Sequence, residues 1–346
     1  MRDEQWQQLL NVIQGQKTAP LPVGFIIDSP WLPGWYGVTI MDYFTSDAIW
    51  LEANLRAIRD FPEVYFLPGF WSEYGMCTEP SSFGARCRWM ENEFPFAEKI
   101  ISDMEHAGEL AKPNPRTDGL LPFVTKRLQH CLPAIQRAGH QIRFAVARGP
   151  LNIASFLCGT TEFMMGIKCN PEETHAMLGT ITDFLIDWLE VQSKSFPTID
   201  GIFLLDDMVG FLRESDFQVF ALPYLKKIFQ SFPFQVKFFH NDAKGTITAK
   251  YLSEIGINLF NFSFQHSLAD MRVWAGNSVT LLGNIPPRDI LANGTPEEVL
   301  RFAQEALSPL AERNRLILSC GGGMPPGAPT NNIVALCKAA RSEPLD

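Results

Sequence analysis

The chain alternates between short apolar segments of strand length and longer segments in which apolar residues recur at helical spacing. The short segments are rich in Val, Ile, Leu and Phe, which favour buried strands, and each ends abruptly at polar residues, Gly or Pro. This pattern predicts eight strands, at Pro22–Ile27, Val64–Leu67, Ile142–Val146, Ile202–Leu205, within Gln235–Asp242, at Ile257–Phe260, Val279–Leu282 and Leu316–Leu318.

Helical spacing covers most of the intervening sequence. The predicted helices are residues 3–16, Asp47–Phe61, Phe96–Leu110, Pro122–Ala138, Asn152–Gly166, Pro171–Ser195, Glu214–Phe229 with a kink at Pro223, Lys244–Glu254, Pro296–Glu312 and Thr330–Ala340. Strands that alternate with helices indicate parallel βαβ units, and eight of them favour a closed (β/α)8 barrel. An open doubly wound sheet is the alternative, although no Gly-x-Gly-x-x-Gly follows the first strand.

We find no linker, repeat or low-complexity segment, so residues 1–346 are expected to form a single TIM-barrel domain with an N-terminal extension and long, aromatic-rich loops. The net charge of −9 argues against nucleic acid and anionic membranes as partners. Seven Cys without a C-x-x-C pair favour free thiols in a reducing compartment. With neither a signal-peptide core nor an apolar run of membrane-spanning length, we expect a cytoplasmic protein.

Polar and aromatic side chains follow the ends of all eight strands. In a barrel these carboxyl ends surround one mouth, where active sites lie. The residues at this mouth are Asp28, Phe70, Trp71, Arg148, Asp206, Asp207, His240, Asp242, Asn261, Asn284, Ser319 and Cys320. Individually they also suit the caps that begin the following helices, but together they favour a substrate-binding mouth.

The stretch Gln235–Asp242 carries the strongest chemical signal. Its apolar run ends in His240, Asn241 and Asp242, so an imidazole and a carboxylate leave one strand end together. Such a pair can converge on a metal or a substrate, or Asp242 can simply cap the next helix. We expect His240, Asp242, Asp206 and Asp207 to be catalytic.

Two loops near the N-terminus are unusually aromatic. They run from Trp31 to Gly37 and from Pro68 to Gly75. Their rings either pack the N-terminal segment onto the barrel or line the pocket of an aromatic or methylated substrate. On the second interpretation the substrate-binding residues are Asp28, Trp31, Trp35, Phe70, Trp71, Arg148, Asn261 and Asn284.

Several phrases resemble those of one superfamily. They are Gly201–Gly210, Leu222–Lys226, Phe239–Asp242, Leu282–Pro287, Gly294–Val299 and Ser319–Pro326. Together they resemble the uroporphyrinogen decarboxylase superfamily, which includes the decarboxylases of haem synthesis and cobalamin- or thiol-dependent methyltransferases. The resemblance extends from about Arg143 to the C-terminus, and it implies a (β/α)8 barrel.

Departures from the family pattern separate its branches. The decarboxylases carry an arginine pair after the first strand, because their substrate is a polycarboxylate, and a catalytic Asp after the second. Here Ile27–Gly34 and Leu67–Trp71 hold neither, and Asp28 would repel a polyanion. The resemblance therefore favours the methyltransferase branch.

The methyltransferase branch binds zinc through His-x-Cys and a distant Cys. Here His240 matches the His, Asp242 replaces the first Cys, and Cys320 lies two residues before the Gly-Cys-Gly position. The resemblance implies an optional zinc on His240 and Asp242, with Cys320 as an optional third ligand. In a metal-free site, His240 and an Asp would act as acid and hydrogen-bond anchors.

These observations predict a corrinoid-dependent methyltransferase. A small methyl donor, for example an aryl methyl ether, would pass its methyl group to a corrinoid on a separate corrinoid-binding protein. His240, or a metal at His240 and Asp242, would stabilise the departing oxygen. The alternatives are a decarboxylase-like lyase that acts on a less acidic substrate and a non-catalytic binding protein.

Overall fold

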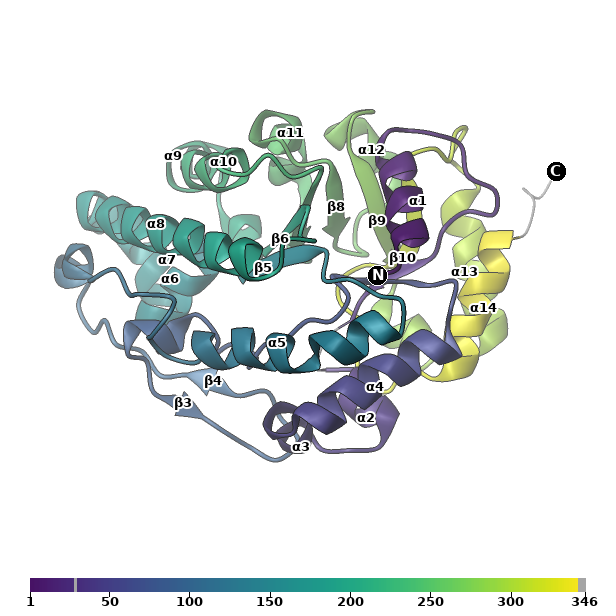
Figure 1. Ribbon diagram of the computed structural model, residues 1–346. Helices are drawn as coiled ribbons and strands as arrows, with labels where there is room; N and C mark the ends of the chain where they lie inside the picture. Colours follow the sequence, from purple (N-terminus) through teal and green to yellow (C-terminus); the bar gives the residue numbers. More distant parts are fainter. Residues whose placement is uncertain (28–29, 342–346) are drawn as a thin grey trace.

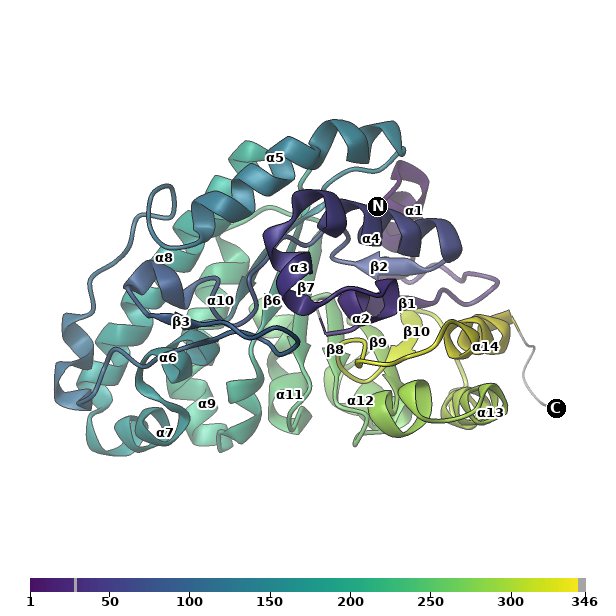
Figure 2. The same cartoon turned by 90° about the horizontal axis from the view of Figure 1, so that it is seen from below.

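The computed structural model describes residues 1–27 and 30–341, and its centre is a parallel sheet surrounded by helices (Figures 1 and 2). Six strands pair side by side in the order β10-β9-β8-β7-β6-β5. Their bounds are β5 Phe144–Arg148, β6 Gly201–Leu205, β7 Val236–Asn241, β8 Leu259–Phe262, β9 Thr280–Ile285 and β10 Leu316–Cys320. All five neighbouring pairs are parallel, as the alternation of strands and helices predicts.

Two further strands extend this sheet into a barrel. β1 (Gly24–Ile26) pairs with β2 (Tyr65–Leu67) in parallel, and a bridge between Val23 and Leu318 joins β1 to β10. Among the described residues no backbone pairing joins β2 to β5, but Tyr65, Leu67 and Phe144 of these two strands belong to one apolar cluster. The (β/α)8 barrel predicted from the sequence is confirmed.

The barrel interior is a continuous apolar cluster to which all eight strands contribute. Its strand residues are Ile26, Tyr65, Leu67, Phe144, Phe203, Val236, Phe238, Leu259, Leu282 and Ile317. Helix α1 (Asp3–Ile13) packs Trp6, Leu9 and Leu10 against this cluster. Figure 1 shows α1 on one side of the strands and α2 and α3 on the other. Because strand side chains alternate between faces, the residues two positions beyond the interior ones also point inward, at the mouth.

The outer layer consists of helices packed on the strands. It contains α2 Leu32–Tyr36, α3 Ile40–Thr45, α4 Asp47–Asp60, α5 Leu121–Arg137, α6 Pro150–Cys158, α7 Thr160–Cys169, α8 Pro171–Ser195, α9 Glu214–Phe220, α10 Leu222–Gln230, α11 Thr246–Ile255, α12 Leu268–Ala275, α13 Pro296–Leu307 and α14 Thr330–Arg341. Short 3-10 turns lie at Pro80–Phe83, Met104–Glu109 and Asp207–Phe211, a π-helical turn lies at Pro287–Ala292, and strands β3 (Cys87–Arg88) and β4 (Phe96–Ala97) form a small hairpin.

Three predicted helices differ from the structure. The helix predicted at Asn152–Gly166 divides into α6 and α7 at Gly159, which has a φ of 102° that helices do not adopt. The helix predicted at Glu214–Phe229 divides before Leu222, because Pro223 occupies the first turn of a new helix. The helix predicted at Phe96–Leu110 is wrong. Only its second half coils, as a 3-10 turn, while Ile100 and Ile101 hydrogen-bond to α6 through the carbonyl of Leu157.

Candidate functional site

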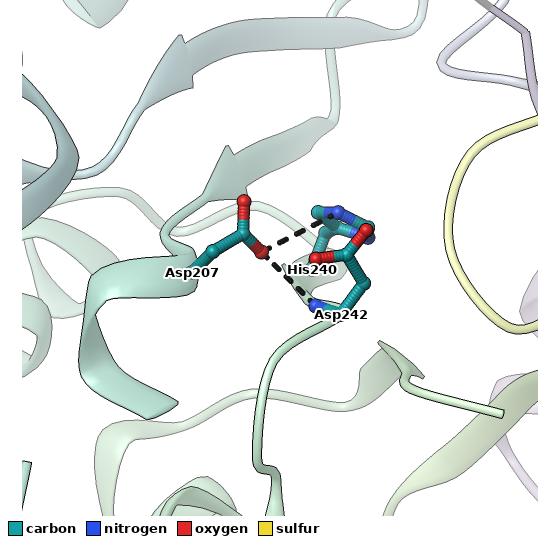
Figure 3. A group of neighbouring side chains, drawn as sticks. All are labelled: Asp207, His240 and Asp242. Atoms are coloured by element: carbon teal, nitrogen blue, oxygen red, sulfur yellow. Dashed lines mark hydrogen bonds and ion pairs between the residues drawn. The ribbon is translucent and has the colours of Figure 1, made fainter. Parts of the chain in front are cut away.

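Asp207, His240 and Asp242 converge at the mouth of the barrel (Figure 3). Asp207 begins the turn after β6, His240 is near the end of β7, and Asp242 follows that strand directly. Each offers one nitrogen or oxygen atom, and these atoms lie within 4.8 Å of one another. The alternation of β7 explains the convergence, because Phe238 lies in the interior cluster and His240 and Asp242 continue on the same face.

Two interactions join the three residues. His240 Nε2 lies 3.6 Å from Asp207 Oδ1, and the same oxygen accepts a hydrogen bond of 3.0 Å from the backbone N–H of Asp242. The imidazole is buried, the Asp207 side chain is 37% exposed, and Asp242 is exposed. The group is therefore closed below by the barrel interior and open above to a ligand.

Backbone hydrogen bonds fix the position of Asp207. Asn152, in α6, accepts at Oδ1 from the N–H groups of Asp207 and Met208, each at 3.1 Å. Burial raises the pKa of Asp207, His240 lowers it, and the Asp242 carboxylate raises it again. The close approach of two carboxylates costs free energy that a cation bound between them would offset.

The structure does not bring Asp206 to this group. Asp206 is fully buried on the opposite face of the strand end, where its Oδ2 accepts from the N–H of Leu151 at the start of α6. Burial raises the pKa of this carboxyl to about 8. Gly149 is required beside it, because a Cβ there would collide with the carboxylate. Asp206 therefore contacts the connection between β5 and α6, and Asp207 is the carboxylate that lies at the mouth.

Cys320 is likewise separated from the group by strand alternation. Ile317 lies in the interior cluster, so Ser319 points inward and Cys320 points outward, where it is buried in the layer between strands and helices. Its thiol lies 3.4 Å from the carbonyl oxygen of Gly322. Among the described residues, the group that could hold a metal contains Asp207 in the place that the sequence suggested for Cys320.

Asn261 and Asn284 occupy the inner face of the next two strands. Asn261 is fully buried, and its Oδ1 lies 2.7 Å from His240 Nδ1. Asn284 donates from Nδ2 to the carbonyl of His266. Beside Asn284, Ser319 is fully buried, and its hydroxyl has no hydrogen-bond partner among the described residues. Asn261 therefore supports the imidazole, whereas Asn284 and Ser319 line the floor of the mouth.

Arg148, at the end of β5, is held by two glutamates that sequence reasoning missed. Its Nη2 lies 2.9 Å from Glu73 Oε2, and its Nη1 lies 3.5 Å from Glu79 Oε2. The backbone N–H of Arg148 also donates to Glu79 Oε1. All three side chains are largely buried. Burial raises the pKa of Glu79, and Arg148 opposes that rise. The guanidinium is thus engaged by the protein's own carboxylates.

The four aromatic residues predicted to bind substrate are all engaged in packing. Trp31 is buried, stacks on Trp35 at 4.9 Å between ring centroids and donates to the carbonyl of Ala328. Trp35 donates to Thr330 in α14. The rings of Phe70 and Trp71 are buried against His140 and Phe203 respectively. Of this set, Trp71 alone belongs to the interior cluster. Asp28, also predicted to bind substrate, lies outside the described residues.

The donor atoms of the group suit a divalent cation. One imidazole nitrogen and two carboxylates are accepted ligands for zinc, and without thiolate they are a harder set than His/Cys/Cys. The Asn261 contact to His240 is the outer hydrogen bond that metal-bound histidines normally have. Asp207, His240 and Asp242 would hold the ion, with the exposed Asp242 on its solvent side.

These features define a (β/α)8 barrel with a carboxylate–imidazole centre at the carboxyl ends of β6 and β7. The chain belongs to the uroporphyrinogen decarboxylase (URO-D) family, which it matches over residues 5–343. The family resemblance deduced from its motifs is confirmed. Among the described residues, no helix has the length and apolar character needed to cross a membrane.

Individual relatives come from both branches of the superfamily. A uroporphyrinogen decarboxylase of Xylella fastidiosa is 24% identical over 311 residues, covering 84% of this chain and 83% of the relative. A methylated-thiol–coenzyme M methyltransferase of Methanosarcina mazei is 23% identical over 234 residues, or 66% of this chain and 58% of that protein. The solved structure of a methyltransferase from Methanosarcina mazei superposes with a TM-score of 0.79 at 19% identity, covering 96% of this chain and 97% of the other.

Proposed function

We propose that this protein is a methyltransferase that moves a methyl group from a small donor to a corrinoid carried by a separate protein. The convergence of Asp207, His240 and Asp242 at the mouth is the observation that carries this proposal. Relatives named as methyltransferases support the branch, and the position of His240 in its motif supports the site.

Asp207, His240 and Asp242 act in this proposal as the ligands of a divalent metal, with zinc as the first candidate. Such an ion would supply Lewis-acid stabilisation of negative charge at the donor's heteroatom. His240 and Asp207 form the buried side of the centre, and Asp242 forms its exposed side. Asn284, on the strand next to that of Asn261, and Ser319, one strand further along, face inward beside the centre and would orient the donor.

The chemical requirement of methyl transfer matches this arrangement. When the cobalt of a reduced corrinoid attacks the methyl carbon of an aryl methyl ether, the carbon–oxygen bond breaks and its electron pair stays on oxygen. An uncompensated oxyanion is a poor leaving group at neutral pH. A site that concentrates ligands for a cation at the base of an open mouth meets that requirement and leaves the outer side accessible to a partner protein.

A decarboxylase-like activity is the second candidate, because the family description and several curated relatives carry that name. The charges at the mouth argue against uroporphyrinogen as the substrate. Asp207 and Asp242 converge there, and the Arg148 guanidinium is already paired with Glu73 and Glu79, so without a bound cation the site would repel a polycarboxylate. A decarboxylase-like reaction would therefore require a less acidic substrate.

The experiment uses the purified, zinc-loaded protein with free cob(I)alamin as acceptor under anaerobic conditions. Aryl methyl ethers, methyl thiols and methylamines serve as donors, and the absorbance of cob(I)alamin reports its methylation. We expect protein-dependent methylation with at least one donor, and loss of that activity in His240→Ala but not in His106→Ala, whose imidazole is exposed. Release of CO₂ from uroporphyrinogen, with no methylation from any donor, would establish the decarboxylase alternative.

A further inference from the structure

Asn261 holds the ring of His240 in one orientation. It lies on β8 directly beside His240 on β7, with the two residues in register. Its Oδ1 is 2.7 Å from His240 Nδ1. On the other side, its Nδ2 donates to two backbone carbonyls, those of Leu282 at 2.8 Å and Cys320 at 3.2 Å. All of these contacts are buried, so water does not compete for them.

The side-chain amide of Asn261 can form these hydrogen bonds in only one orientation. Carbonyl oxygens accept hydrogen bonds and cannot donate them, so the two backbone carbonyls require the NH₂ group. The Oδ1 atom must then face the imidazole, and an amide oxygen can only accept. His240 Nδ1 must therefore carry a proton and donate it. A reversed amide would place oxygen against two oxygens and leave buried groups unpaired.

We propose that Asn261 is a positioning residue that fixes His240 as the Nδ1–H tautomer, so that Nε2 presents its lone pair to the centre. This inference rests on the proposed function for its chemical meaning. Nε2 is the ring atom that faces Asp207, at 3.6 Å from Oδ1. A neutral imidazole held in this tautomer is a metal ligand at Nε2 and has no proton there to give.

For a neutral His240, the orientation favours a role as ligand over a role as acid. As a neutral acid, His240 would need its proton on the nitrogen that faces the substrate, and Asn261 holds that proton on the opposite nitrogen. As a ligand, it needs the lone pair that Asn261 leaves at Nε2. In the proposed function, Asp207, His240 and Asp242 would hold a cation that stabilises charge on the departing heteroatom, and Asn261 would contribute by orienting the imidazole.

The first test measures the tautomer directly in metal-free protein. Long-range ¹H–¹⁵N correlation spectra of ¹⁵N-histidine-labelled protein distinguish a protonated from an unprotonated ring nitrogen, and His240→Gln assigns the signals. We expect Nδ1 protonated and Nε2 unprotonated for His240. Asn261→Leu removes the acceptor, so the ring should become a mixture of tautomers. A wild-type ring with its proton on Nε2 alone overturns the proposal.

The second test measures zinc affinity by calorimetry, with no donor present. Loss of an outer hydrogen bond to a metal-bound histidine weakens binding about 10- to 100-fold, and we expect that loss in Asn261→Leu. The matched control is Asn332→Leu. Asn332 is also buried and donates from Nδ2 to two carbonyls, those of Leu291 and Gly294, but it does not contact His240. Equal losses of affinity in both variants would reduce Asn261 to a structural role.

The Asn261→Asp variant distinguishes the effect of residue 261 on the orientation of His240 from its effect on the stability of the fold. Its carboxyl group keeps an oxygen facing Nδ1 but turns another oxygen toward two carbonyls. We therefore expect this variant to be less stable than the wild type and yet to retain the Nδ1–H tautomer. Loss of that tautomer in a folded Asp variant contradicts the proposal. If the wild type has the expected tautomer but binds no zinc, the metal function fails and the role of Asn261 stands.

Discussion

His240 and Asp207 face one another across the ends of two neighbouring strands, with the Nε2 and Oδ1 atoms 3.6 Å apart. His240 lies in β7 and Asp207 lies two residues after the end of β6, so the parallel pairing of these two strands brings the residues together without a long loop. Asp242 completes the group because its backbone N–H donates to the same Asp207 oxygen. The ends of β6 and β7 thus bring the proposed metal ligands together, and Asn152 of α6 holds the backbone of Asp207 in place.

The choice of Asp207 as third ligand can be tested against Cys320. We expect Asp207→Ala to weaken zinc binding by more than about tenfold, since even an outer-shell loss weakens it about 10- to 100-fold. Cys320→Ser should leave the affinity unchanged, because its thiol lies on the outer face of β10. Elemental analysis and calorimetry measure both effects. Zinc lost in Cys320→Ser and retained in Asp207→Ala would restore the ligand set suggested by the sequence.

The buried pairing of Arg148 predicts a large stability effect. Arg148→Ala would remove the cation that pairs with the buried carboxylates of Glu73 and Glu79, and removal of one partner of a buried ion pair costs about 3–5 kcal/mol. Urea unfolding followed by circular dichroism measures this free energy. Glu73→Gln combined with Arg148→Met should recover part of it. An Arg148→Ala protein of unchanged stability would mean that the guanidinium is available to a substrate.

The sequence predicted the barrel, and its catalytic candidates included all three residues that converge at the mouth, although it did not separate Asp207 from Asp206. Eight apolar runs with polar ends were enough to place His240 and Asp242 together at the mouth. It was harder to decide which of two adjacent residues at a strand end points into the barrel, because a shift of one residue moves a side chain to the opposite face of the sheet. Asp206 and Asp207 differ in this way, and so do Ser319 and Cys320. Extending the alternation from Phe203 and Ile317 would have placed Asp207 and Ser319 inward.

Long-range partners had no signal in the sequence. Glu73 and Glu79 lie in an irregular region more than 65 residues from Arg148, and neither periodicity nor a motif connects them. The aromatic loops were ambiguous for a related reason. Whether a Trp lines a pocket or packs a helix depends on which distant segment covers it, and Ala328 and Thr330 cover Trp31 and Trp35.

Trp31 is expected to contribute stability through packing. Its side chain is fully buried and stacks on Trp35, so Trp31→Ala should lower the free energy of unfolding by about 3–5 kcal/mol. Trp31→Phe, which keeps a ring, should cost less. Thermal unfolding measures both changes. If Trp31→Ala instead preserves the melting temperature and raises the KM for the methyl donor, Trp31 contacts the substrate as the sequence suggested.

His140 predicts how stability depends on pH in a region remote from the mouth. Burial, together with the nearby Met1 amino group, lowers the pKa of His140 to about 4, compared with 6.5 for an ordinary imidazole. Between these values the unfolded chain binds a proton that the folded protein does not, so acid favours unfolding. The stability that His140 contributes is fully present above about pH 6.5 and is lost as the pH falls toward 4.

His140→Gln should therefore flatten the decline in stability between pH 6.5 and pH 4. Urea unfolding at several pH values gives the slope for the wild type and for the variant. His106→Gln is the control, because that imidazole is exposed and its hydrogen bond to Glu109 raises its pKa. Since a pKa raised by folding has the opposite sign, the control should not flatten the acid limb. An unchanged slope in His140→Gln would show that the buried imidazole takes up its proton without unfolding.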